Sequence, residues 1–370
     1  MTIGRRGFVA AAAGAALVGG GGWLLAQRGP DYEAEAKALW SRRPSAADEL
    51  AYLVHYATLA ANSHNAQAWR FGATTDGVAI APDLGRALPV ADADNHHLYA
   101  SLGCAAENLM LAATAASRAA AIHFAEGDDG AGGAGRVEIS LAHGGTARDP
   151  LFNAILARQC TRSDFDGQPV SAADLAVLAR AARVEGCELV LIDTRNRIEQ
   201  VLELILAANT AQVSDPAFRA ELRSWLRFNA REAVTQGDGL YAACSGNPSL
   251  PSWLGPQVFD LVFKPGAENA RYARQVRSSA GLAVFVSARD DPAHWVRAGR
   301  SYQRFALQAT ALGIRHAHLN QPVEVAAIRP QLAALLGVRD GRVDLVVRYG
   351  RAPAMPRSLR RPLEAVLRRG

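Results

Sequence analysis

The sequence lacks the residue patterns that mark several common functional classes. It contains only four cysteines in 370 residues, and none has the C-x-x-C spacing, so it predicts neither a metal cage nor an assignable disulfide. No G-x-S-x-G segment is present, which excludes a hydrolase nucleophile elbow. The glycine tracts at 19–22 and 130–135 lack a strand–turn–helix context, so no dinucleotide or P-loop site is expected.

A strong excess of one charge is absent as well. The formal net charge is +5, and the basic residues are not interleaved with aromatic side chains, which make up 7% of the chain. A nucleic-acid surface needs that combination, so no nucleic-acid partner is expected. Individual arginines are sufficient to hold an anionic small molecule. With 49% hydrophobic residues, the chain can build a large core.

The N-terminus resembles a twin-arginine export signal. Arg5 and Arg6 precede Gly7-Phe8, and a mildly apolar run continues to about residue 26. We therefore expect residues 1–27 to engage the twin-arginine translocase and the protein to be periplasmic or otherwise exported. Because no clean A-x-A site follows the run directly, an uncleaved inner-membrane anchor remains an alternative. No later segment is long and apolar enough to predict a transmembrane helix.

Hydrophobic periodicity predicts both helices and strands, arranged in two halves. We expect a linker over 28–44, a first half over 45–148, and a second half over 149–370 that ends in a basic tail. Strands are expected at 78–81, 137–141, 188–192, 282–286, 314–318 and 343–349. The stretch 236–265 is rich in Gly, Pro and Ser, and a loop of that length predicts a lid.

Helix starts are indicated by two capping boxes. Ser45 with Asp48, and Ser171 with Asp174, have the required spacing of three residues. Each pair precedes a run of apolar residues at helical spacing. We therefore expect one helix to begin near each pair.

Two alanine-rich helices, expected at 97–118 and 294–312, are weakly similar in sequence. Each has a glycine near its N-terminal end, Gly103 and Gly299, and small residues of this kind allow two backbones to approach closely. Duplication of the two halves is one interpretation. The other is that any two alanine-rich helices look alike.

One polar stretch stands between a predicted core helix and a predicted core strand. Ser63-His64-Asn65-Ala66-Gln67-Ala68-Trp69-Arg70-Phe71 places hydrogen-bonding side chains before two aromatic residues. It resembles the S-x-N-x-Q-P-W-x-F segment of nitroreductase-like flavoproteins, with Ala68 where proline is usual. Arg158-x-x-x-Arg162 resembles the arginine-rich segment of the same superfamily. The leader, the chain length and the order of segments look most like its Acg-type branch.

The resemblance implies an α+β nitroreductase-like fold with FMN as cofactor. In this fold two degenerate halves would form an intramolecular pseudo-dimer, with antiparallel or mixed sheets flanked by helices, so that the chain is a monomer. The segment with Ser63 and Asn65 occurs only in the first half, and the segment with Arg158 and Arg162 occurs only in the second. We therefore expect one complete FMN site per chain. Arginine suits the phosphate, because its guanidinium forms charge-assisted, bidentate hydrogen bonds. The implied cofactor-binding residues are Ser63, Asn65, Gln67, Arg158, Arg162, Gly299, Arg360 and Arg361. Gln159 and Cys160 depart from the Arg and Ser/Thr usual in the family, which puts one phosphate contact in doubt.

The resulting functional hypothesis is an exported FMN-dependent oxidoreductase that reduces a small nitroaromatic or quinone-type acceptor. The alternative is a non-catalytic protein that binds or sequesters FMN under its lid. No side chain stands out as a catalytic acid or base. His96-His97 and His316-x-His318 lack i,i+4 helical spacing. We expect no carboxylate cluster to accompany either pair, and therefore no metal site.

Overall fold

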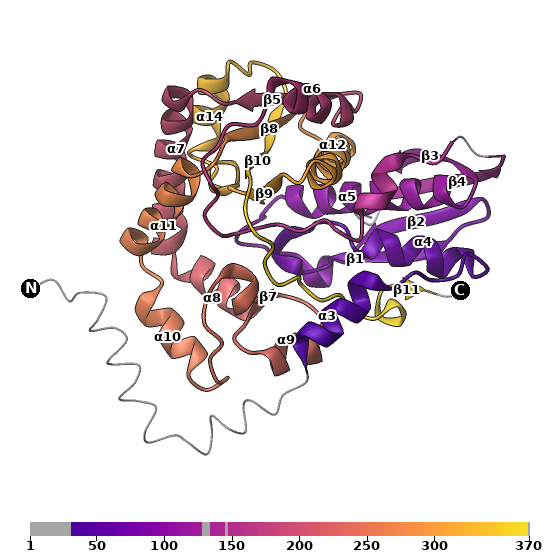
Figure 1. Cartoon of the computed structure of the whole chain (residues 1–370), viewed down its shortest axis with the longest axis horizontal. Coiled ribbons are helices and arrows are strands. Elements are labelled where there is room, and N and C mark those ends of the chain that lie inside the picture. Colours follow the sequence, from indigo (N-terminus) through magenta and orange to yellow (C-terminus); the bar gives the residue numbers. More distant parts are fainter. Residues whose placement is uncertain (1–30, 128–133, 145–146, 369–370) are drawn as a thin grey trace, which may run out of the picture.

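The structure of the chain is a computed structural model that describes residues 31–127, 134–144 and 147–368. The expected export segment, residues 1–27, lies outside the described residues. Among those that are described, no helix combines the length and apolarity needed to cross a bilayer. Helices flank two larger sheets, and a third sheet has only two short strands, which confirms the predicted α+β class (Figure 1).

A five-stranded sheet forms the main part of the first half. Its strands are β1 (Trp69–Ala73), β2 (Gly77–Pro82), β3 (Arg118–Ala125), β4 (Arg136–His143) and β11 (Leu367–Arg368). Their order is β11-β1-β2-β4-β3, with antiparallel pairing except for β11, which runs parallel to β1 and places Leu367 opposite Phe71. The end of the expected basic tail therefore completes the sheet of the first half.

A four-stranded antiparallel sheet forms the centre of the second half. Its order is β5-β8-β10-β9, with β5 (Cys187–Ile192), β8 (Gly281–Ser287), β9 (Arg315–His318) and β10 (Arg342–Gly350). Every residue of β8 and β10 is buried, as expected for strands covered on both faces. Apolar side chains of α7 (Arg195–Ser214), α11 (Pro265–Arg277) and α14 (Arg329–Leu336) join those of the sheet in one core cluster.

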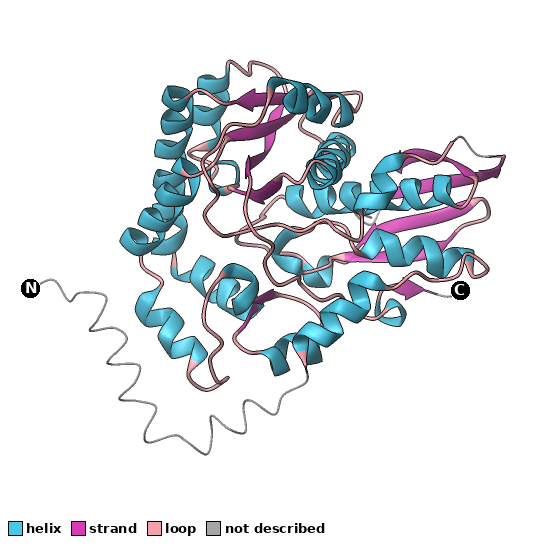
Figure 2. Cartoon of the chain, in the orientation of Figure 1, coloured by secondary structure: helices cyan, strands magenta, loops and turns pink. Residues whose placement is uncertain are grey.

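Two long helices, α5 (His96–Ala115) and α12 (Pro292–Ala311), pack against each other between the two sheets (Figures 1 and 2). A Cβ added at Gly103 would lie 2.0 Å from the carbonyl oxygen of Val296, and one added at Gly299 would lie 1.9 Å from that of Ala100. The contact is reciprocal, since each glycine meets the residue three positions before the other. Only glycine permits this separation of the two backbones.

The remaining elements correct several expectations. The expected linker contains α3 (Tyr32–Ser41), whose Trp40 Nε1 donates to the Ser358 carbonyl at 3.0 Å. Helix α4 (Glu49–Thr58) is capped by Asp48, which accepts from the Ala51 amide, and not by Ser45. The Ser171 cap on α6 (Ala172–Ala181) is as predicted.

The expected lid contains more regular structure than its composition indicates. It includes β7 (Leu240–Tyr241), which pairs with β6 (Leu226–Arg227), and α10 (Gly255–Val262). Glycine and proline do not prevent α10, because Gly255 and Pro256 occupy its first turn, where a missing amide donor costs nothing. The other short helices near the lid and sheet are α8 (Pro216–Trp225), α9 (Ala230–Gln236) and α13 (Gln321–Glu324).

We predict that Gly299→Ala destabilises the protein by roughly 1–3 kcal/mol, because the added methyl group forces the backbones of α5 and α12 apart. Urea unfolding followed by circular dichroism measures this change. Gly266→Ala is the matched control, since Gly266 also lies in a helix but has no atom within 4 Å of the new methyl group. The control should be neutral or slightly stabilising. Equal stability of Gly299→Ala and the parent would contradict the tight crossing.

Candidate functional site

The turn between α4 and β1 has a strained backbone. His64, Asn65 and Gln67 have φ values of 48°, 52° and 53°, a left-handed region that residues other than glycine rarely adopt. The Asn62 side chain stabilises the turn by accepting from the Gln67 amide at 2.9 Å. Strain of this kind costs about 1–3 kcal/mol per residue and clusters at ligand-binding sites.

Side chains of this turn hold the start of the lid and the C-terminal tail together. Asn65 Nδ2 donates to the carbonyl of Gly239 at 3.1 Å, and Gln67 Nε2 donates to that of Gly237 at 2.9 Å. Both side chains also bond the tail at 359–361. The two amides thus fix three separate segments of the chain at one point.

A small cavity of about 60 Å³ beside the turn is lined by arginine and by no carboxylate. Its four arginines are Arg158, Arg162, Arg357 and Arg360. Among the described residues, none of the four forms an ion pair with Asp or Glu. The cavity therefore has a concentrated positive charge that no carboxylate compensates.

The C-terminal end of α4 holds two of these guanidinium groups. Arg360 Nε donates to the Thr58 carbonyl at 2.6 Å, and Arg158 Nη2 donates to the Leu59 carbonyl at 2.9 Å. Helix carbonyls carry only a partial negative charge. Burial, together with the charge of Arg158, lowers the pKa of Arg360 to about 9. The Nε of Arg158 is buried without a hydrogen-bond partner, so a ligand anion would find a donor there.

Arg162 occupies the junction of three cavities. It lines the arginine-rich cavity, a polar cleft of about 220 Å³ and a third cavity of about 410 Å³. Within the described chain, its guanidinium has no hydrogen bond or ion pair to a protein group. A cation placed this way is available to a ligand.

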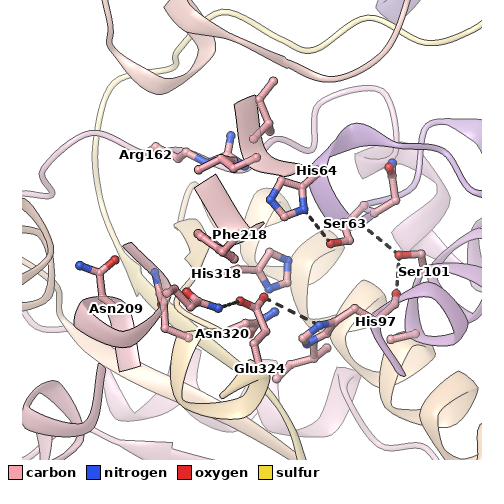
Figure 3. A pocket seen from close by; sticks show the side chains of 18 of the residues that line it. Ser63, His64, His97, Ser101, Arg162, Asn209, Phe218, His318, Asn320 and Glu324 are labelled. Atoms are coloured by element: carbon pink, nitrogen blue, oxygen red, sulfur yellow. Dashed lines mark hydrogen bonds and ion pairs between the residues drawn. The ribbon is translucent and has the colours of Figure 1, made fainter. Parts of the chain in front are cut away.

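Most groups that line the cleft are uncharged and polar, and Arg162 and Glu324 add one basic and one acidic side chain (Figure 3). The Ser63 amide donates to Ser101 Oγ at 3.2 Å, and that hydroxyl donates to the His97 carbonyl at 2.7 Å. Ser63 Oγ lies 3.3 Å from His64 Nδ1, and burial lowers the pKa of His64 to about 4. The imidazole is therefore neutral at pH 7. Other polar residues of the wall are Asn209, Gln212, His318, Asn320 and Glu324.

The third cavity lies between the lid helix α10 and α11 and is mainly apolar. Phe228, Phe259 and Phe263 line it, and it shares Phe263 and Tyr272 with the polar cleft. Leu240, at the start of the lid, lines all three cavities. The lid therefore leaves an apolar space next to the cleft.

The structure brings five of the eight predicted binding residues together. Ser63, Asn65, Arg158, Arg162 and Arg360 line the first two cavities. The other three line neither: Gln67 is fully buried, Gly299 packs against α5, and Arg361 Nη2 donates to the Ala365 carbonyl.

Several cleft residues could not be identified from the sequence. Ser101 and Glu324 come from segments that carry no recognisable motif. Ser63 and Arg162 were predicted, and His64 lies inside the polar stretch, whereas His97 was considered only as a metal ligand. The surroundings of Cys160 could not be predicted from its neighbours in the sequence either. Although burial opposes it, the proximity of His316 and His318 holds the pKa of the Cys160 thiol well below its usual range.

No family model matches the chain. It is 23% identical over 320 residues to a Mycobacterium tuberculosis protein named "Putative NAD(P)H nitroreductase Rv3131", which covers 84% of this chain and 88% of that protein. It is 24% identical over 330 residues to "Putative NAD(P)H nitroreductase acg" from the same species, with 86% and 95% covered.

Solved structures give a weaker likeness. The FMN-dependent nitroreductase NfnB from Mycobacterium smegmatis, in complex with NADPH, has a TM-score of 0.41 at 14% identity and covers 59% of this chain and 96% of its own. A Bacteroides fragilis nitroreductase with bound FMN has a TM-score of 0.35 at 15% identity, with 55% and 89% covered. The curated relatives, which match over most of their length, support the resemblance of this chain to the nitroreductase-like superfamily.

Proposed function

We propose that the protein is an FMN-dependent oxidoreductase of the nitroreductase type. The observation that carries this proposal is the set of arginines without a carboxylate partner, next to a cleft lined mainly by uncharged polar groups. A phosphate fits the arginines, because it supplies the negative charge that they lack. A polar ring system fits the cleft, where Ser63, Ser101 and backbone groups can donate and accept hydrogen bonds.

The residues that would hold FMN can be assigned by their chemistry. Arg158, Arg162 and Arg360 would bind the phosphate, and Ser63 with its neighbours in the cleft would face the polar edge of the ring. When bound, FMN supplies the capacity to accept a hydride and pass electrons to an acceptor. The protein orients the ring and limits the access of water. Among the described residues, no ionisable side chain is placed with a clear role as acid or base.

An aromatic acceptor fits the apolar cavity under the lid. Phe228, Phe259, Phe263 and Tyr272 provide ring surfaces beside the cleft, which supports a nitroaromatic or quinone-type acceptor. The names of the curated relatives indicate NAD(P)H as the electron donor.

Sequestration of FMN without turnover is the second candidate function. The start of the lid favours it, because Gly237 and Gly239 are hydrogen-bonded to the turn that carries Ser63. A lid fixed at its base restricts access to the cleft. The cavity under α10 favours turnover instead, since it provides room for an acceptor.

Export and assembly complete the proposal. The twin-arginine pattern supports delivery across the cytoplasmic membrane by the translocase, as a soluble periplasmic protein or with the signal retained as an anchor. The reciprocal contact of Gly103 and Gly299 supports two halves arranged as a monomeric pseudo-dimer. The arginine-rich cavity can hold one phosphate group, which supports one FMN per chain.

We predict that Arg162→Ala weakens FMN binding by about 10- to 100-fold, the range expected when a hydrogen bond to a charged group is lost. Quenching of flavin fluorescence during titration measures the affinity. Riboflavin, which lacks the phosphate, should bind equally well to the variant and the parent. Arg289→Ala is the control, since the Arg289 side chain is 76% exposed and lies outside all three cavities. An unchanged FMN affinity in Arg162→Ala would place the phosphate elsewhere.

We also predict that Asn65→Ala weakens FMN retention without unfolding the chain. The side chain positions Arg360 by accepting from its Nη1 at 3.0 Å, so its loss removes one of the hydrogen bonds that hold the guanidinium and one that holds the start of the lid. Hydrogen exchange should increase at 237–240 and 358–361, while the circular dichroism spectrum stays the same. Full FMN retention combined with faster exchange would show that Asn65 acts only on the lid.

Turnover distinguishes the two candidate functions. For the oxidoreductase, we expect anaerobic NADPH to bleach the flavin absorbance of the purified protein, and a quinone to restore it. The absorbance and the FMN-to-protein ratio, expected to be near one, are measured on the same sample. Slow or absent bleaching by NADPH, with normal reduction by dithionite, would favour sequestration.

A further inference from the structure

The pair His96-His97 at the start of α5 follows Asp92 and Asp94 in the sequence, and the fold adds Glu324 to its surroundings. The expectation that no carboxylates accompany these histidines is wrong. Asp92 Oδ1 lies 3.7 Å from His97 Nδ1, and Glu324 Oε1 lies 3.8 Å from the same nitrogen. One ligand atom from each of Asp92, His96 and His97 falls within a distance of 4.8 Å of the others.

The hydrogen bond of His96 leaves its Nδ1 free to act as a ligand atom. Its Nε2 lies 2.8 Å from Asp344 Oδ1, and Asp344 is itself fixed by the Ser287 amide, which donates to its Oδ2 at 2.6 Å. A proton on Nε2 leaves Nδ1 as the acceptor. That Nδ1 is buried and has no hydrogen-bond partner. A carboxylate behind a histidine in this way is the usual outer support of a metal ligand.

His97 has no hydrogen bond from its ring to any described group, although the residue is only 5% exposed. Buried imidazoles are normally hydrogen-bonded, because an unpaired polar atom in the interior costs about 1–3 kcal/mol. His96 and His97 both line a cavity of about 270 Å³ together with Asp92 and Glu324. His97 thus faces two carboxylates at 3.7 and 3.8 Å without a hydrogen bond to either, a separation that suits donors around one ion.

Two arginines also line this cavity, but their charges are directed elsewhere. Arg342 donates to Asp94 and to Asp290, at 2.7 Å in each case. Arg329 lies 3.8 Å from Asp94 and donates through Nε to the Val323 carbonyl at 2.7 Å. The carboxylates of Asp92 and Glu324 are therefore not neutralised by these two cations.

We propose that Asp92, His96, His97 and Glu324 form a binding site for a divalent metal ion of the zinc type. Two imidazoles and two carboxylates match the donor set that Zn²⁺ takes in four-coordinate sites. Ligand atoms of Asp92, His96 and His97 already lie within 4.8 Å of one another, and Glu324 is the fourth donor, 3.8 Å from His97. Because His97 and Glu324 also line the polar cleft, the ion would tie the N-terminal end of α5 to α13 across its wall. The proposal does not depend on the identity of the ligand in the cleft.

The test measures zinc binding by the full-length protein after removal of metal with a chelator. We expect about one tightly held Zn²⁺ per chain by elemental analysis after desalting, and a higher melting temperature with Zn²⁺ present. Competition with a chromophoric chelator gives the affinity. His97→Gln should reduce the affinity at least tenfold and abolish the thermal shift, without loss of fold, because its ring holds no partner in place. His123→Gln, at an exposed histidine of β3, is the matched control and should bind zinc as the parent does.

Three outcomes would overturn the assignment. The first is a zinc content well below one per chain in the parent. The second is a zinc affinity that survives His97→Gln but is lost in Cys160→Ser or His318→Gln, which would place the ion at the other histidine pair. The third is displacement of Zn²⁺ by an equal concentration of Mg²⁺, since a hard cation does not prefer imidazole nitrogen.

Discussion

The crossing of α5 and α12 is the constraint on which the rest of the structure depends. Gly103 and Gly299 allow each backbone to touch a carbonyl of the other helix, so the two sheets are held at a fixed separation on either side of the pair. His97 lies six residues before Gly103, which is about 9 Å along the helix axis at 1.5 Å per residue. The crossing therefore also sets the position of the cleft wall that α5 supplies.

The second organising feature is electrostatic. A buried guanidinium is ordinarily paired with a carboxylate, but Arg158 and Arg360 are held by carbonyls at the end of α4 instead. The strained turn at 62–67 positions this end of the site, because Asn65 binds Arg360 and the lid together. Rigid support of this kind keeps like charges close in the absence of a ligand. Binding of an anion would remove much of their mutual repulsion.

The sequence predicted the local features of the site better than their connections. The motif around Ser63 and the pair Arg158 and Arg162 led to residues that do lie around the same cavities, because motifs preserve side chains whose chemistry is specific. The hydrogen bonds from Asn65 and Gln67 to the start of the lid could not be predicted, since their partners are main-chain carbonyls about 170 residues later. Pairing of β11 with β1 was missed for the same reason. Long-range contacts of two-residue strands leave no periodic pattern in the sequence.

The charges around the cleft are arranged with opposite signs on its two sides. Arg162 and the cavity beyond it are basic, whereas Glu324, with Asp92 behind it, provides the acidic wall. A ligand with one anionic end is therefore attracted to one orientation and repelled from the reverse, before any specific hydrogen bond forms. A cation held by His97 and Glu324 would weaken the repulsion from the acidic wall and leave the attraction of Arg162 unchanged. Because His97 and Glu324 line both cavities, an ion held by them would change the electrostatic potential in the cleft, and the two binding equilibria would then be coupled.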